Sequence, residues 1–154
     1  MRFTIDASVH LNALNPAEEG SAASQRFLAA VHQRPSGAAS PPHTVFSPTL
    51  LMVEIAASVA RVLDDAERGV QLAWAVRELP SQTWIDLDAP LTEAAAEVAA
   101  GRRLRGADAV YATVAQRSGS HLVTLDRQQI DRLPPRVLTC RPVEALELLD
   151  EASD

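Results

Sequence analysis

The chain has 154 residues, of which 47% are apolar and 22% charged, an ordinary balance for one globular domain with its own core. The formal charge of −6 argues against a broad basic surface for nucleic acid, and the complete absence of lysine excludes P-loop phosphate binding and Schiff-base catalysis. Since no apolar run approaches a membrane span, no signal-peptide pattern opens the chain and Cys140 is the single cysteine, we expect a protein of the reducing cytoplasm.

Apolar periodicity and turn residues predict short strands that alternate with helices along the chain. In chain order we expect a strand at 2–6, helices at 7–12 and 21–32, a Pro/Gly/Ser-rich loop at 34–43, a strand at 44–46, helices from 49 to about 63 and from about 66 to 79, a strand at 83–87, helices at 90–100 and 106–116, strands at 121–125 and 137–140, and a helix at 142–149. Strands that alternate with helices favour a parallel sheet covered on both faces. The fold class we expect is therefore α/β, a three-layer α/β/α sandwich, forming one domain over residues 1–150 with a short tail at 151–154.

Local signals set the ends of several helices. Thr49 is a good N-cap for the helix that follows it, and Gly101 and Gly119 are expected to end two later helices. In the helix after Thr49, one apolar face is predicted at helical spacing, consisting of Leu51, Ile55, Val59 and Val62.

Four acidic residues stand where a segment built for burial normally excludes a charge. Asp6 and Asp126 close apolar strands, Glu54 is the one charged residue between Leu50 and Ala60, and Asp108 opens an apolar helix. A carboxylate is rarely buried without a partner, because its desolvation costs free energy. In a parallel sheet these positions all reach the edge formed by the carboxyl ends of the strands, where ligands bind.

Oxygen ligands without His or Cys suit Mg²⁺ or Mn²⁺ better than Zn²⁺. Carboxylates that gather at one place raise one another's pKa values, and a divalent cation relieves this repulsion. Such metals can activate a water molecule and stabilise the leaving oxygen of a phosphodiester. Asp6, Glu54, Asp108 and Asp126 therefore form a candidate catalytic metal site.

The segments around these acids resemble the four acidic motifs of PIN domains, in order, spacing and total length. The motifs are Ile5-Asp6-Ala7-Ser8, Val53-Glu54, Gly106-Ala107-Asp108-Ala109-Val110-Tyr111-Ala112 and Val123-Thr124-Leu125-Asp126. The chain is most similar to the VapC toxins of bacterial toxin–antitoxin pairs, and the resemblance covers essentially its whole length. It implies a Mg²⁺-dependent endoribonuclease that is usually dimeric and is silenced by an antitoxin protein.

The resemblance also assigns roles to single residues. Asp6, Glu54 and Asp108 match the central metal ligands, and Asp126 completes the site directly or through a water molecule. Ser8 matches a small hydroxyl residue that contacts a metal-bound water or a phosphate, and Thr124 has a similar supporting role. Many members carry a further acid two residues after the fourth, where this chain has Gln128, so the number of metal ions, one or two, is left open.

Two other regions are candidates for partner binding. Arg102, Arg103 and Arg105 flank the Asp108 helix and either meet RNA phosphates or belong to a solvated loop. The helices between Leu50 and Leu79 are so rich in apolar residues that a surplus face either joins the core or receives an antitoxin helix or a second protomer.

Two alternative functions belong to other classes. A phosphatase that uses Asp6 as its nucleophile would typically have an aspartate at the position of Ser8 and a lysine elsewhere, and both are missing. A PIN-like module that binds RNA or protein without cutting is the second alternative, and four unneutralised carboxylates argue against it.

Overall fold

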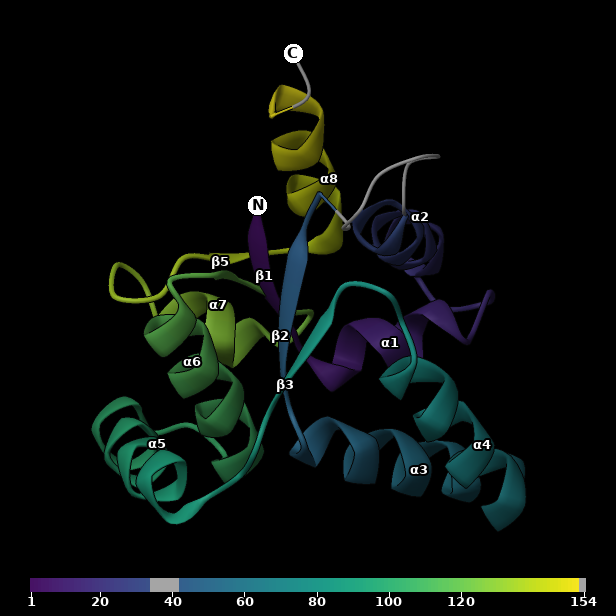
Figure 1. Ribbon diagram of the computed structural model, residues 1–154, viewed down its shortest axis with the longest axis horizontal. Coiled ribbons are helices and arrows are strands. Elements are labelled where there is room, and N and C mark those ends of the chain that lie inside the picture. The colour runs from purple at the N-terminus through teal and green to yellow at the C-terminus, as the bar shows by residue number, and fades with distance from the viewer. Residues whose placement is uncertain (34–41, 153–154) are drawn as a thin grey trace.

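The computed structural model describes residues 1–33 and 42–152, and five parallel strands form its central sheet (Figure 1). The strands are β1 (Arg2–Ile5), β2 (Thr44–Pro48), β3 (Gln82–Ile85), β4 (His121–Val123) and β5 (Thr139–Cys140). Their order across the sheet is β3-β2-β1-β4-β5, with every neighbouring pair parallel. The order reverses at β1, which is the place where open parallel sheets leave a crevice beyond the carboxyl ends of their strands.

Helices cover both faces of this sheet. They are α1 (Ala7–Ala13), α2 (Ser21–His32), α3 (Leu50–Leu63), α4 (Ala66–Arg77), α5 (Ala89–Arg102), α6 (Gly106–Ser118), α7 (Arg127–Arg132) and α8 (Pro142–Glu151). Helices α2 and α8 contribute to the core cluster on one face, and α3, α4 and α6 contribute to the cluster on the other. The architecture is the expected three-layer α/β/α sandwich.

Alternating strand residues divide the core between the two faces. In β1, Phe3 and Ile5 pack with Phe27 of α2 and with α8, whereas Leu122 of β4 joins the cluster on the opposite face. On that opposite face the buried Tyr111 of α6 packs beside α3. The period of two along each strand thus divides apolar side chains between two helical layers.

Helix α3 packs closely against α4, and most but not all of its predicted apolar face is buried. Leu51, Ile55 and Val59 are buried as expected, but Val62 is 81% exposed, so the predicted apolar face was wrong at its last member. The close approach occurs at Gly69, where an added Cβ would lie 2.5 Å from the carbonyl oxygen of Ala56. The helices meet through small residues, and the end of α3 projects beyond the core.

Some element ends differ from the sequence prediction. Strand β2 continues through Pro48, because its pairs with β1 end at Val45 and the missing N–H of proline costs no bond on that side. The hydroxyl of Thr49 accepts from the backbone N–H of Leu87 (3.1 Å) instead of capping α3. Helix α5 runs past Gly101 and ends at Arg102, and the C-cap residue Arg103 adopts the left-handed conformation.

One helix was missed entirely. No element was predicted between 126 and 136, where α7 follows its N-cap residue Asp126, whose carboxylate accepts two backbone N–H groups of the first turn. Most of the loop expected at 34–43 lies outside the described residues, as do residues 153–154 of the tail. Within the described ranges, no helix is both long and apolar enough to span a membrane.

Candidate functional site

The four acidic residues come from four different elements at one edge of the sheet. Asp6 follows β1, Glu54 lies in the second turn of α3 behind β2, Asp108 lies in the first turn of α6, and Asp126 follows β4. Parallel strands β1 and β4 are neighbours, so the residues that follow them are brought together at their shared carboxyl end.

Asp6 is the most deeply placed of these carboxylates, with 6% of its surface exposed. Its Oδ1 accepts the backbone N–H of Ser8 at 2.7 Å, which caps helix α1. Its Oδ2 accepts a hydrogen bond from Nε2 of Gln129 at 2.7 Å. Both oxygens of this buried carboxylate therefore have protein donors.

Glu54 is half-buried and is held by Tyr111, whose hydroxyl donates to Oε2 at 2.5 Å. Burial raises the pKa of Glu54; the hydrogen bond from Tyr111 opposes this shift, and the charges of Asp6 and Asp108 add to it. The same surroundings raise the pKa of the Tyr111 hydroxyl well above its usual range, mainly through burial and then through the nearby Glu54. Tyr111 thus stays a neutral donor that orients Glu54.

Asp108 is the acid of this cluster whose pKa is raised most. Burial raises its pKa to about 6, and the charges of Asp6 and then Asp126 act in the same direction. Arg105 partly offsets the shift. Oδ1 of Asp108 accepts Nε2 of Gln129 at 3.3 Å, whereas Oδ2 is buried and has no hydrogen-bond partner among the described residues. This oxygen is a free acceptor inside the acidic cluster.

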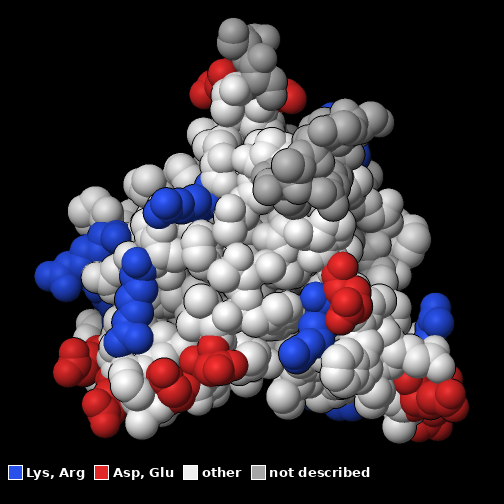
Figure 2. Space-filling model, in the orientation of Figure 1, with Lys and Arg blue, Asp and Glu red and all other residues white. Residues whose placement is uncertain are grey.

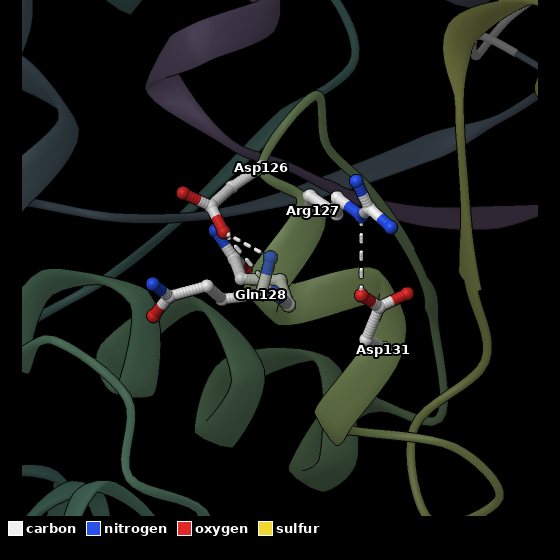
Figure 3. Close-up of polar contacts among 5 residues, drawn as sticks. Asp126, Arg127, Gln128 and Asp131 are labelled. Atoms are coloured by element: carbon white, nitrogen blue, oxygen red, sulfur yellow. Dashed lines mark hydrogen bonds and ion pairs between the residues drawn. The ribbon is translucent and has the colours of Figure 1, made fainter.

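Asp126 caps α7 through one of its two oxygens. Oδ1 accepts the backbone N–H groups of Gln128 at 2.7 Å and Gln129 at 3.1 Å, and the second oxygen points away from the helix (Figure 3). Asp126 therefore caps the helix with Oδ1 alone, and its second carboxylate oxygen can still accept a hydrogen bond or bind a cation. Figure 3 also shows that Arg127 and Asp131 pair with each other on the other side of α7, at 3.5 Å.

Ser8 and Thr124 fasten the backbone near these acids. The hydroxyl of Ser8 accepts the N–H of Leu125 at 3.2 Å, and the hydroxyl of Thr124 accepts the N–H of Asp126 at 3.0 Å. These bonds tie the start of α1 to the segment after β4, so that Asp6 and Asp126 are held close in space. The supporting role expected of both hydroxyls toward water or phosphate stays a prediction.

The three arginines before α6 have different surroundings. Arg102 donates to the backbone carbonyl of Arg132 at 3.3 Å, and the side chain of Arg132 in turn donates to the carbonyl of Arg103. Arg103 and Arg105 are exposed, and Arg105 is the one whose charge acts on Asp108. On the face drawn in Figure 2, charged side chains gather in small groups, one of which is acidic and lies against a basic one, and the middle of the face is largely uncharged.

Tyr111 and Gln129 are the two functional candidates that the sequence did not single out. Tyr111 follows Asp108 by three residues, which puts both on one face of α6, and Gln129 follows Asp126 by three residues. That spacing is a usable signal in retrospect. Neither side chain is charged, however, and each contacts an acid that is distant in sequence, so its role cannot be recognised from neighbouring residues.

The donor set suits a divalent cation in its chemistry. It consists of carboxylate oxygens alone, and it contains the unpartnered Oδ2 of Asp108. Neighbouring negative charges add to the burial that raises the pKa values of Glu54 and Asp108. In residues 1–33 and 42–152, however, no three His, Cys, Asp or Glu side chains are already arranged around a common ion position. The amide of Gln129 donates to two of the acids, so cation binding requires side chains to move.

Comparisons with known proteins agree with the fold. The chain is similar in fold to VapC20 of Mycobacterium tuberculosis, a sarcin–ricin loop cleaving toxin, with 19% identity, a TM-score of 0.65 and coverage of 84% of this chain and 93% of that chain. A protein from Pyrobaculum aerophilum has 24% identity and a TM-score of 0.60, and the match covers 100% of this chain and 97% of that one. VapBC2 from Rickettsia felis, bound to a promoter DNA fragment, matches with 16% identity, a TM-score of 0.62 and coverage of 92% and 98%.

Among curated protein sequences none matches this chain. The family model of the PIN domain, in contrast, matches residues 3–134, which include all four acids and every strand but β5. The chain belongs to the PIN domain family.

Proposed function

We propose that this protein is a Mg²⁺- or Mn²⁺-dependent endoribonuclease that hydrolyses RNA phosphodiester bonds, and that it is the toxin of a type II toxin–antitoxin pair. One observation carries the proposal. Four carboxylates from four elements meet at the carboxyl edge of the sheet, and one of them keeps a buried oxygen without a partner among the described residues. Membership of the PIN domain family and the similarity in fold to a toxin that cleaves the sarcin–ricin loop support it.

In this proposal Asp6, Glu54 and Asp108 hold the cation, and Asp126 completes the site. A divalent cation bound there supplies a nucleophilic water and stabilises charge on the phosphate. The protein's own part is to orient the ligands: Tyr111 fixes Glu54 through its hydroxyl, and the N–H of Ser8 fixes Asp6. Ser8 and Thr124 hold the backbone of the ligands in place, as expected of supporting residues around a metal site.

The RNA partner must be attracted locally, because the chain is acidic overall. Arg103 and Arg105 are exposed next to the helix that carries Asp108, so they are the proposed contacts to RNA phosphates, whereas Arg102 is partly used by the carbonyl of Arg132. Because cellular RNA is the substrate, the proposed place of action is the cytoplasm.

Helices α3 and α4 are the proposed surface for protein partners. Large apolar side chains are exposed there, namely Val53, Val62, Leu63, Val70 and Trp74. A cavity of about 470 Å³ between α1, α3 and α4 is lined by some of these side chains. An apolar surface of this kind suits an antitoxin segment and a second protomer. Several similar structures, such as one from Klebsiella pneumoniae, are toxin–antitoxin complexes.

The geometry disfavours the phosphatase alternative. A nucleophilic aspartate must present an oxygen to the phosphate, but Asp6 is buried and both of its oxygens already accept hydrogen bonds. One observation favours the non-cleaving module: Gln129 donates hydrogen bonds to two of the acids. The experiment must therefore distinguish this module from a nuclease.

The test is cleavage of total cellular RNA by the purified protein, with Mg²⁺ or Mn²⁺ and with EDTA, beside Asp108→Asn. We expect discrete RNA fragments that require the metal ion. They should disappear in Asp108→Asn, because the loss of the Asp108 carboxylate removes the free acceptor Oδ2. If folded protein free of antitoxin cleaves no RNA, the binding module replaces the nuclease.

A further inference from the structure

The side chain of Gln129 lies at the centre of the acidic cluster, between Asp6 and Asp108. It is completely buried. Its Nε2 donates to Oδ2 of Asp6 at 2.7 Å and to Oδ1 of Asp108 at 3.3 Å. Its backbone N–H donates to Oδ1 of Asp126 at 3.1 Å, so this one residue contacts three of the four acids.

The chemistry of the partners decides which way the amide points. A carboxylate can only accept hydrogen bonds, so the NH₂ group must face Asp6 and Asp108, because the opposite orientation would direct a carbonyl oxygen at two anions. In this orientation Oε1 of Gln129 is buried and lacks a partner within the described part of the chain. An unsatisfied buried acceptor costs free energy, because it has given up its hydrogen bonds to water. The protein tolerates that cost and gains two donors for its acids.

The amide hydrogens occupy Oδ2 of Asp6 and Oδ1 of Asp108, whereas Oδ2 of Asp108 has no partner among the described residues. Because Oδ1 of Asp6 already accepts the N–H of Ser8, a cation shared by the two acids must compete with the amide for the oxygens that the amide occupies. Charge-assisted hydrogen bonds are the stronger class, so the bridge stabilises the cluster without a metal ion. A cation that binds Asp6 and Asp108 through these oxygens must first displace Nε2. The cost of breaking those bonds is then subtracted from the binding free energy.

We propose that Gln129 is a positioning residue that holds Asp6 and Asp108 together in the metal-free protein and lowers the affinity of the site for divalent cations. The inference rests on the proposed function, because it requires the acids to be metal ligands. It makes the site a weak one that is filled only when the metal is abundant.

The direct test is calorimetric titration of Mn²⁺ into the wild type, Gln129→Met and Gln128→Met. Methionine has nearly the length of glutamine without its donors, and Gln128 is the exposed neighbour on the same helix. We expect Gln129→Met to bind Mn²⁺ about tenfold more tightly, roughly the worth of one hydrogen bond, while its metal-free melting temperature falls. The control is expected to match the wild type in both.

A rise in Mn²⁺ affinity together with a fall in melting temperature distinguishes a positioning role from a merely structural one. A packing defect would lower both stability and metal affinity. Equal or weaker Mn²⁺ binding by Gln129→Met, beside normal binding by the wild type, overturns this inference and leaves the metal site intact. Absence of Mn²⁺ binding by the wild type overturns the proposed function, and this inference with it.

A second measurement uses the wild type alone and so does not depend on the variant folding. The side-chain NH₂ signals of Gln129 in NMR spectra are expected to be protected from solvent exchange and to shift and lose protection as Mg²⁺ is added. Those of Gln128 are expected to stay unchanged. If Mg²⁺ binds and the Gln129 signals do not change, the amide is not displaced and the inference is wrong.

Discussion

Replacing Asp6 with asparagine is expected to reduce metal-dependent RNA cleavage by at least about 100-fold, because a direct ligand matters at least as much as the residues that support it. Asparagine keeps the size of the side chain and one oxygen that can still accept the N–H of Ser8, so the cap of α1 survives. Gln129 can turn its amide so that its unpartnered Oε1 accepts from the new amide group. The fold is therefore expected to persist.

Without metal, Asp6→Asn is expected to be at least as stable as the wild type. The charge of Asp6 raises the pKa values of both Glu54 and Asp108, so its removal lowers the repulsion within the cluster. Adding Mn²⁺ should raise the melting temperature of the wild type more than that of the variant.

The matched control is Asp131→Asn, which makes the same chemical change at an exposed position of α7. It is expected to cleave at the wild-type rate, because Asp131 pairs with Arg127 at 3.5 Å away from the cluster. Equal cleavage by Asp6→Asn and the wild type would refute the assignment of the site.

Acidification is expected to weaken Mn²⁺ binding, with the transition near pH 6. A metal ligand must be deprotonated, and burial, together with Asp6 and Asp126, raises the pKa of Asp108 to about 6. Below that pH, affinity should fall by about tenfold per pH unit, and the raised pKa of Glu54 acts in the same direction. Titrations from pH 5 to 8 in weakly coordinating buffers measure this, and constant affinity from pH 7 to 5.5 would contradict it.

The same pKa has the opposite consequence for the metal-free protein. A carboxyl whose pKa is raised on folding binds its proton more tightly in the folded state than in the unfolded state. Its contribution to stability is therefore lost as the pH rises from 3.8, the ordinary pKa of an aspartate, through about 6. Asp108→Asn has no carboxyl at this position and should not lose stability in this way. Its free energy of unfolding relative to the wild type should therefore rise as the pH increases from 3.8 to about 6.

The architecture could be predicted because the spacing of apolar residues within each short segment indicates whether the segment is a strand or a helix. Apolar strands that alternate with helices require a parallel sheet with two covered faces, and the acids that end β1 and β4 then have to share an edge. Helix α7 escaped prediction because its six residues lack an apolar period and its start is defined by the carboxylate of Asp126. Asp126, which the sequence predicts as a ligand, caps this helix in the structure, and its role as a ligand stays a prediction.

The details that depend on contacts between distant residues could not be predicted. Val62 has the spacing of a core residue, but it lies in the last turn of α3, which projects beyond the core, and it is exposed. The partners Tyr111 and Gln129 lie 57 and 123 residues from the acids that they contact most closely. Helical spacing marks their faces, but it does not reveal which carboxylate each will meet.

The most direct test of the account is a crystal structure of the protein grown with Mn²⁺, with the metal located by its anomalous scattering. We expect a Mn²⁺ ion bound by oxygens of Asp6 and Asp108 at about 2.2 Å, with Glu54 and Asp126 close by and the amide of Gln129 displaced. Mn²⁺ bound away from these acids, or an unchanged Gln129 bridge at saturating Mn²⁺, would contradict the account.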